Sequence, residues 1–168
     1  MTEVTIRSAA LDDVPGIQRV ARESWHAAHD HILDPAAVDR QVDEWYATDP
    51  VTERVTMTDV HVFVADADDV VGFASGVAAN RADHGELAEL ATIYVHPDWW
   101  GERVGSRLLE RVEDEMRERG FSELSITVLS ENQVGLSFYR KHGYEVVSET
   151  ETGLAGQTVR ECELRGSL

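Results

Sequence analysis

Apolar and polar residues alternate at the start of the chain and then change to a helical spacing. The alternation over residues 3–9 predicts a first strand. Apolar residues at helical spacing predict a helix over residues 11–29, with Pro15 in its first turn. A second, shorter helix is expected over residues 34–46, with Pro35 at its first position. The chain is therefore expected to begin with one strand followed by two helices.

The rest of the chain changes repeatedly between strand and helix patterns. Residues 59–79 predict a hairpin around an aspartate-rich turn, and a long apolar strand over 85–97 ends at a proline. This order, β-α-α-β-β-β-α-β-α-β-β, predicts one α/β domain over residues 1–168, with a parallel crossover centred on 90–129. The later elements are expected as a helix over 102–119, a strand over 122–130, a helix over 131–143 and strands over 144–151 and 156–165.

The composition is that of a soluble globular protein. Hydrophobic residues make up 42% and charged residues 28% of the 168 positions. No apolar run approaches the roughly 20 residues that a membrane-spanning helix needs. The first residues lack the basic and apolar regions of a signal peptide. A single cysteine, Cys162, rules out an intrachain disulfide. Together these features predict a cytoplasmic protein that does not bind membranes.

The chain is strongly acidic. Its 32 Asp and Glu residues outnumber its 15 Lys and Arg residues, which gives a formal net charge of −17. One explanation is an acidic surface that steers a cationic substrate. The other is adaptation to high intracellular salt, as in extreme halophiles. We favour the second, because the acids are scattered along the chain rather than gathered in one block. No basic patch points to a nucleic-acid partner.

The stretch "HPDWWGERVGSRLL", residues 96–109, places two glycines where a strand gives way to a helix. Glycine at such a turn lets backbone amides approach an anion, and the first turn of a helix binds phosphate well. Glycine is also common in tight turns that bind nothing. The spacing fits neither the GxxxxGK[ST] phosphate loop nor the three-glycine dinucleotide motif.

A second run, "ENQVGLSFYRKHGYE", changes this picture. Together the two runs resemble the GNAT superfamily of acetyl-CoA-dependent N-acetyltransferases. The family signature (Gln or Arg)-x-x-Gly-x-(Gly or Ala) falls here on Trp100, Arg103 and Gly105, so Trp100 and Arg103 depart from it. The Asn-x-x-Ala-x-x-(aromatic or Leu)-Tyr run, which closes in Gly-Phe in the family, falls on Asn132, Gly135, Phe138, Tyr139, Gly143 and Tyr144.

The resemblance implies a fold and a donor site. The GNAT fold has a mixed central sheet of six to seven strands, splayed between the fourth and fifth by a bulge after the fourth, and flanked by about four helices. The pantetheine arm of acetyl-CoA would lie in the splay against backbone groups of Ile93, Tyr94 and Val95, with the Val95 N–H polarising the thioester carbonyl. The pyrophosphate would be bound by the turn residues Gly101, Glu102, Arg103, Val104, Gly105 and Ser106, with Trp100 beside them.

Three further side chains acquire roles through the resemblance. Asn132 would hold the pantetheine, although it also suits a helix N-cap. Tyr139 matches the tyrosine that protonates the leaving thiolate, although it could simply be a packed aromatic. Glu89 would act as the base, directly or through a water, or it is an ordinary strand carboxylate.

The acceptor site is the least defined part of the resemblance. In the family the segment from the first to the second helix walls this site, which makes Trp25, His26 and His29 candidates for acceptor binding. The histidines here lack the HExxH spacing or cysteine partners of a metal site, so we expect no metal.

The expected activity is transfer of acetyl from acetyl-CoA to a primary amine of a small molecule or peptide. No nucleophile elbow or Cys–His pair is visible, which favours direct attack without a covalent enzyme intermediate. The alternative is a non-catalytic acyl-CoA-binding regulatory module. The family's habit also implies a homodimer through the C-terminal strands.

Overall fold

The computed structural model describes residues 3–79 and 86–168 of the chain. The order of elements follows the sequence prediction with one addition, the helix α3. Short 3-10 turns at Leu11–Asp13 and Pro97–Trp99 precede α1 and α4. The elements are β1 (Thr5–Ser8), α1 (Val14–His29), α2 (Pro35–Trp45), α3 (Thr48–Thr56), β2 (His61–Asp66), β3 (Val70–Ala78), β4 (Leu87–Val95), α4 (Val104–Glu118), β5 (Glu123–Leu129), α5 (Gln133–Lys141), β6 (Glu145–Leu154) and β7 (Gln157–Ser167).

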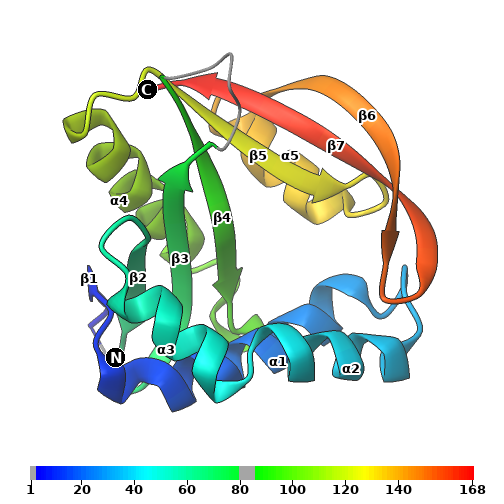
Figure 1. The fold of residues 1–168 in the computed structure, drawn as a ribbon, viewed down its shortest axis with the longest axis horizontal. Helices are drawn as coiled ribbons and strands as arrows, with labels where there is room; N and C mark the ends of the chain where they lie inside the picture. Colours follow the sequence, from blue (N-terminus) through cyan, green and yellow to red (C-terminus); the bar gives the residue numbers. More distant parts are fainter. Residues whose placement is uncertain (1–2, 80–85) are drawn as a thin grey trace.

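Seven strands form one mixed sheet in the order β1-β2-β3-β4-β5-β7-β6. Neighbouring strands are antiparallel except β4 and β5, which are parallel because α4 connects them as a crossover. Figure 1 shows the first four strands and the last three as two halves that diverge from one end of β4 and β5. The predicted α/β fold class and the parallel crossover are confirmed.

The helix α3 is absent from the sequence prediction. Its sequence, TDPVTERVT, contains several β-branched residues, which are poor helix formers. Packing supplies what propensity lacks, because Val51 is 2% exposed and belongs to the core under α1 and α2. The described residues thus form five α-helices instead of about four. None of these helices is both long and apolar enough to cross a membrane.

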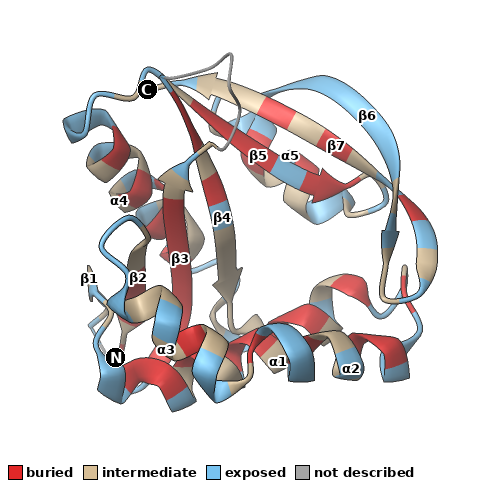
Figure 2. Cartoon of the chain, viewed as in Figure 1, coloured by how far each residue is buried: buried red, intermediate tan, exposed pale blue. Residues whose placement is uncertain are grey.

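Two hydrophobic cores lie on opposite faces of the sheet. One joins the sheet to α4 and α5, with Leu108 and Leu109 fully buried in it. The other joins the sheet to α1, α2 and α3 around Trp25 and Phe73. Figure 2 shows β3 buried along most of its length and β6, at the edge of the sheet, almost entirely exposed.

A bulge in β4 prepares the splay of the sheet. The register pairs Ser75 with Thr92 and Gly76 with Leu90, so Ala91 has no partner in β3. The resemblance implied a bulge after the fourth strand, but the bulge lies inside that strand. An extra residue in one strand reverses which side chains face each side beyond it. Thr92 consequently faces the α1–α3 side, where its hydroxyl lies 2.8 Å from that of Ser75.

Candidate active site

The parallel ladder between β4 and β5 is short. It joins Leu87 to Glu123, Ala88 to Leu124 and Glu89 to Ser125. Within the described residues the ladder ends there, while β4 continues to Val95 and β5 to Leu129 (Figure 1). The second half of β4 therefore presents backbone groups to a gap in the sheet.

The hydrogen-bond pattern of β3 and β4 shows which backbone groups face this gap. The His96 N–H donates to the Val71 carbonyl at 2.9 Å, and hydrogen-bonded pairs alternate along an antiparallel ladder. Tyr94 accordingly bonds to β3, whereas the N–H and C=O groups of Ile93 and Val95 point away from it. Of the three positions predicted to bind the pantetheine, only Ile93 and Val95 have backbone groups on the gap side.

The turn after β4 is braced by Trp100. Its indole Nε1 donates to the Val95 carbonyl oxygen at 2.8 Å, although the side chain is 46% exposed. The Glu102 N–H points back to the Trp99 carbonyl oxygen at 3.4 Å. The Glu102 N–H therefore points into the turn, whereas the resemblance implied that it would bind the pyrophosphate.

The helix α4 begins at Val104, two residues later than predicted, because Gly101 and Arg103 adopt left-handed conformations with φ of 82° and 65°. Glycine tolerates such a φ, whereas arginine is strained by it. The family signature has glycine at the position of Arg103, and this conformation gives the physical reason.

The first turn of α4 leaves amides that can bind an anion. The Arg107 N–H makes the first bond of this helix, to the Arg103 carbonyl oxygen at 3.1 Å. The amides of Val104, Gly105 and Ser106 precede it and have no helical partner. The positive end of the helix dipole adds to their attraction for phosphate.

Close packing joins this turn to α5. A side chain at Gly105 would place its Cβ 3.4 Å from the Phe138 ring and 3.7 Å from Val95. The Ser106 hydroxyl lies 3.0 Å from Nε2 of His142, just after α5. The two family motifs, far apart in sequence, therefore meet beside the gap.

Asn132 caps α5. Its Oδ1 accepts a hydrogen bond from the Gly135 N–H at 3.0 Å, as an N-cap does. A Cβ at residue 135 would lie 2.8 Å from the Asn132 Nδ2 atom, which explains the glycine where the family has alanine. The cap uses Oδ1, so the two protons on Nδ2 remain able to donate to a ligand.

Tyr139 lies at the edge of the α4–α5 core and is 8% exposed. Its ring makes edge contacts with Phe138 and Tyr144, with centroids 5.2 and 6.3 Å apart. Burial raises the pKa of the Tyr139 phenol well above its ordinary value of about 10. The phenol therefore stays protonated at neutral pH and can donate a proton. Burial raises the pKa of Tyr94 on β4, and the Tyr46 and Tyr139 phenols add to that rise.

Glu89 occupies the point where the sheet divides. It is the last β4 residue paired to β5, and it stands opposite Val77 on β3. Cross-strand partners share a sheet face, so the half-buried Glu89 carboxylate lies on the α1–α3 side together with Val77.

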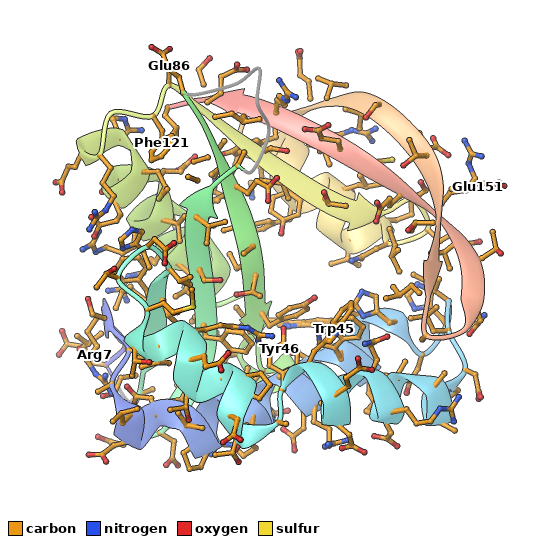
Figure 3. The ribbon with its side chains drawn as sticks, viewed as in Figure 1. Arg7, Trp45, Tyr46, Glu86, Phe121 and Glu151 are labelled. Carbon is orange, nitrogen blue, oxygen red and sulfur yellow. The ribbon has the colours of Figure 1, made fainter. Side chains whose placement is uncertain are left out.

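A pocket of about 350 Å³ lies on this face, between α1–α3 and strands β3 and β4. The Trp25 ring, 4% exposed, meets Trp45 with centroids 5.6 Å apart and Tyr94 at 5.9 Å. Figure 3 shows Trp45 and Tyr46, at the end of α2, beside the C-terminal part of β4. The full lining is Trp25, Trp45, Tyr46, Arg54, Val60, Ser75, Val77, Ala91, Thr92 and Tyr94.

Of the three predicted acceptor-binding residues, only Trp25 lines the pocket. His26 instead joins α1 to α2, because Asp30 lies 2.6 Å from its Nδ1 and Asp39 lies 2.7 Å from its Nε2. The side-chain hydrogen bond to Asp39, followed by that to Asp30, raises the pKa of His26.

His29 lies behind Trp25, with ring centroids 4.6 Å apart. It is 6% exposed, and its Nδ1 is buried without a hydrogen-bond partner in the described structure. Burial lowers the pKa of His29 to about 4. No cluster of three His, Cys, Asp or Glu side chains suited to a metal ion occurs among residues 3–79 and 86–168.

The sequence prediction missed Tyr46 and Arg54 in this pocket. Their signal was weak, because α3 itself was not predicted and Tyr46 stands at the very end of a predicted helix. Only the packing of α2 and α3 against β3 and β4 brings these side chains to Trp25.

Comparisons with known proteins agree with this geometry. The family model described as the acetyltransferase (GNAT) family matches residues 20–144. A spermidine N(1)-acetyltransferase of Thermoplasma acidophilum is 28% identical over 149 residues, which cover 85% of this chain and 89% of that protein. The L-amino acid N-acyltransferase MnaT of Escherichia coli is 31% identical over 98 residues, 58% of this chain and 57% of that protein.

Solved structures share the whole fold. The N-acetyltransferase PaiA of Thermoplasma acidophilum, in complex with coenzyme A, superposes with a TM-score of 0.85 at 24% identity and covers 99% of both chains. A likeness at this identity establishes the arrangement of strands and helices described above.

Proposed function

The chain belongs to the GNAT family of acetyltransferases, and we propose that it moves an acetyl group from acetyl-CoA directly to the primary amine of a small molecule. The observation that carries this proposal is the splay beyond the Glu89–Ser125 pair. Its wall presents the Val95 N–H, and it lies beside the free amides at the start of α4. This arrangement suits an extended acyl thioester with a phosphate at one end.

The residues present fit the donor. The amides of Val104, Gly105 and Ser106 would bind the pyrophosphate, and the Arg103 guanidinium can add a charge-assisted hydrogen bond to a phosphate. The Asn132 Nδ2 protons and the outward backbone groups of Ile93 would hold the pantetheine. The donor supplies an activated acetyl thioester, and the protein residues orient and polarise it.

Acetyl transfer then needs three contributions from the protein. The Val95 N–H donates to the thioester oxygen as negative charge develops there. Glu89, directly or through a water, accepts a proton from the ammonium form of the acceptor. The amine nitrogen forms a C–N bond to the acetyl carbon as the C–S bond breaks, and the nitrogen then loses its second proton to solvent to give the neutral amide. Tyr139 donates its proton to the departing CoA thiolate and regains one from solvent.

A non-catalytic acyl-CoA-binding module is the alternative function. Such a module needs the donor site only. The pocket between α1–α3 and strands β3 and β4 has no use in a module that only binds the donor, so it favours the enzyme. Tyr139 is compatible with either function, because its ring also packs in the core.

The acceptor is proposed to be a small molecule. One relative is named for spermidine and another for L-amino acids, and both are small amines. The pocket next to Tyr94, at about 350 Å³, is in the lower part of the size range of small-ligand sites.

A thiol-release assay tests the proposal. Wild-type protein is given acetyl-CoA and a panel of amines, and N-acetylated products are identified by mass spectrometry. We expect amine-dependent release of CoA well above hydrolysis, and a large loss of kcat in Glu89→Gln at neutral pH if the carboxylate is the base. Tight binding of acetyl-CoA by calorimetry, without CoA release for any amine, would establish the module instead.

A further inference from the structure

The pocket beside Tyr94 is lined by a positive charge, although the chain as a whole is strongly acidic. Of the ten side chains that line it, Arg54 is the only charged one, and no lining residue in the described structure is acidic. Yet acidic residues number 32 of 168 in the chain as a whole. A pocket for a polycation would be expected to carry carboxylates, because ammonium groups are bound by opposite charge.

Arg54 is held in place without a carboxylate. Its Nη2 donates to the Trp45 carbonyl oxygen at 2.8 Å, and its guanidinium carbon lies 5.3 Å from the centre of the Tyr46 ring. Its positive charge opposes the rise that burial causes in the pKa of Tyr46. The half-buried guanidinium is thus oriented by a backbone oxygen and an aromatic face.

Arg19 and Arg107, like Arg54, donate to backbone carbonyl oxygens, but several other arginines are paired with carboxylates. Arg7, Arg22 and Arg160 each form ion pairs with one or two carboxylates. Among residues 3–79 and 86–168, no carboxylate lies within ion-pair distance of Arg54. Arg54 differs from Arg19 and Arg107 because it lines a pocket whose other described lining residues are uncharged, and this favours a ligand that supplies the anion.

The unused donors of Arg54 suit a carboxylate. The bond to the Trp45 carbonyl uses one Nη2 proton, so the second Nη2 proton remains available together with the Nε or Nη1 proton beside it. Guanidinium groups bind carboxylates in a planar, two-pronged geometry. Because Arg54 is already oriented, little side-chain freedom would be lost when such a ligand binds.

We propose that Arg54 binds a carboxylate of the acceptor, so that the substrate is a small amino acid-like molecule with an apolar or aromatic body rather than a polyamine. This inference rests on the acetyl transfer proposed above and names its substrate class. The rings of Trp25, Trp45 and Tyr94 contact the body of the substrate. Its amine lies toward the β4 side of the pocket.

An ammonium group held by the aromatic rings is the competing arrangement. Aromatic faces do attract cations. The Tyr46 face is already covered by Arg54, however, and a second cation in the pocket would be repelled by that guanidinium. The charge in the pocket therefore favours an anionic group on the acceptor.

Matched pairs of substrates test the proposal. We would measure kcat/KM for phenylalanine, tryptophan and leucine, for the amines that their decarboxylation produces, and for spermidine. We expect the wild-type protein to prefer at least one amino acid over its decarboxylated partner by roughly 10-fold or more, as charge-assisted hydrogen bonds allow. In Arg54→Gln that ratio should fall toward one, mainly through a higher KM for the amino acid.

Two further variants sharpen the test. Arg54→Lys keeps the charge and loses the two-pronged geometry, so it should recover part of the preference. Arg40→Gln removes an exposed arginine of α2 outside the pocket and should leave the ratio unchanged.

The outcomes separate this inference from the proposed function. If spermidine or the decarboxylated amines are better substrates than every amino acid, or if Arg54→Gln keeps the wild-type ratio, the carboxylate proposal is wrong and acetyl transfer stands. If no amine of any kind is acetylated while acetyl-CoA binds, the proposed function itself is wrong.

Discussion

The indole N–H of Trp100 donates to the carbonyl oxygen of Val95 at 2.8 Å, and this bond ties the turn before α4 to the end of β4. The same residue, Val95, directs its N–H into the splay of the sheet. Trp100 stands where the family signature has Gln or Arg. Its side chain thus has a structural task, positioning the turn relative to the strand, that does not require a direct contact with phosphate.

Replacing Trp100 by phenylalanine should weaken the grip on the donor. The ring remains, but the Val95 carbonyl loses its partner, at a cost of about 0.5–1.5 kcal/mol for a bond near the surface. We expect the KM for acetyl-CoA to rise by roughly 2- to 10-fold. Steady-state kinetics would measure this change. Trp45→Phe, in the acceptor pocket, is the matched variant and should alter the KM of the amine instead; equal effects of both variants on the donor would contradict this account.

Arg103 allows conformational strain to be separated from phosphate binding. Its φ of 65° favours glycine, so Arg103→Gly should raise the free energy of unfolding relative to Arg103→Ala by about 1 kcal/mol. Both variants lack the guanidinium and should show the same increase in the KM for acetyl-CoA. Urea denaturation and steady-state kinetics measure the two effects independently. Equal stabilities of the glycine and alanine variants would show that the turn relaxes without strain.

Tyr139→Phe should reduce turnover and leave donor binding intact. Loss of a general acid typically lowers kcat by about 10²- to 10⁴-fold. Calorimetry with acetyl-CoA and single-turnover kinetics would distinguish chemistry from binding. Tyr144→Phe is the control, because that neighbouring phenol donates to Glu113 at 2.7 Å and serves packing. A Tyr144→Phe enzyme as slow as Tyr139→Phe would argue against a proton donor at residue 139.

His29 should make the free energy of unfolding decrease as the pH is lowered through a defined range. Burial lowers its pKa in the folded state to about 4, from 6.5. Between these values the unfolded chain binds the extra proton, so the free energy of unfolding falls as pH falls, by about 1.5 kcal/mol from pH 6.5 to 5. The raised pKa of His26 changes the free energy of unfolding only above pH 6.5. The lowered pKa of Asp13 changes it only below pH 3.8. His61, whose pKa burial also lowers from 6.5, adds to the fall inside this range, whereas His26 and Asp13 act outside it.

Urea denaturation at several pH values would measure this effect. His29→Leu should flatten the dependence between pH 6.5 and 5, because it removes the buried ring whose protonation opposes folding. His31→Leu changes an exposed histidine and should keep the wild-type slope. An unchanged slope in His29→Leu would assign the pH dependence to other residues.

The acidic charge predicts a dependence of stability on salt. At a net charge of −17 the folded chain repels itself, and molar salt shortens the range of that repulsion to about 3 Å. If the composition is an adaptation to high salt, the midpoint of thermal unfolding and the activity should both rise from low salt to molar KCl. Full stability and activity at low salt would contradict the adaptation.

Local spacing along the chain was sufficient to predict most elements, and the proposed donor motifs were identified through their resemblance to a family. Helix and strand periods are properties of neighbouring residues, and the Gly101–Ser106 turn and the Asn132–Tyr139 run each lie within one short segment. Segments whose local signal opposes their structure were not predictable in this way. The helix α3, rich in β-branched residues, forms because Val51 is buried, and packing decides that burial.

The acceptor site depended on contacts between distant residues. Nothing in the spacing of α1 shows that His26 is engaged by Asp39 of α2, or that His29 is sealed behind Trp25. The bulge at Ala91, which reverses the faces to which the following side chains of β4 point, arises from the register with β3. The position of Arg54 at the pocket wall likewise arises only when α2 and α3 pack on the sheet. The proposed donor site was predictable from the family resemblance, because each of its motifs lies within one short segment. Acceptor chemistry follows from side chains on separate elements, and only tertiary packing assembles them.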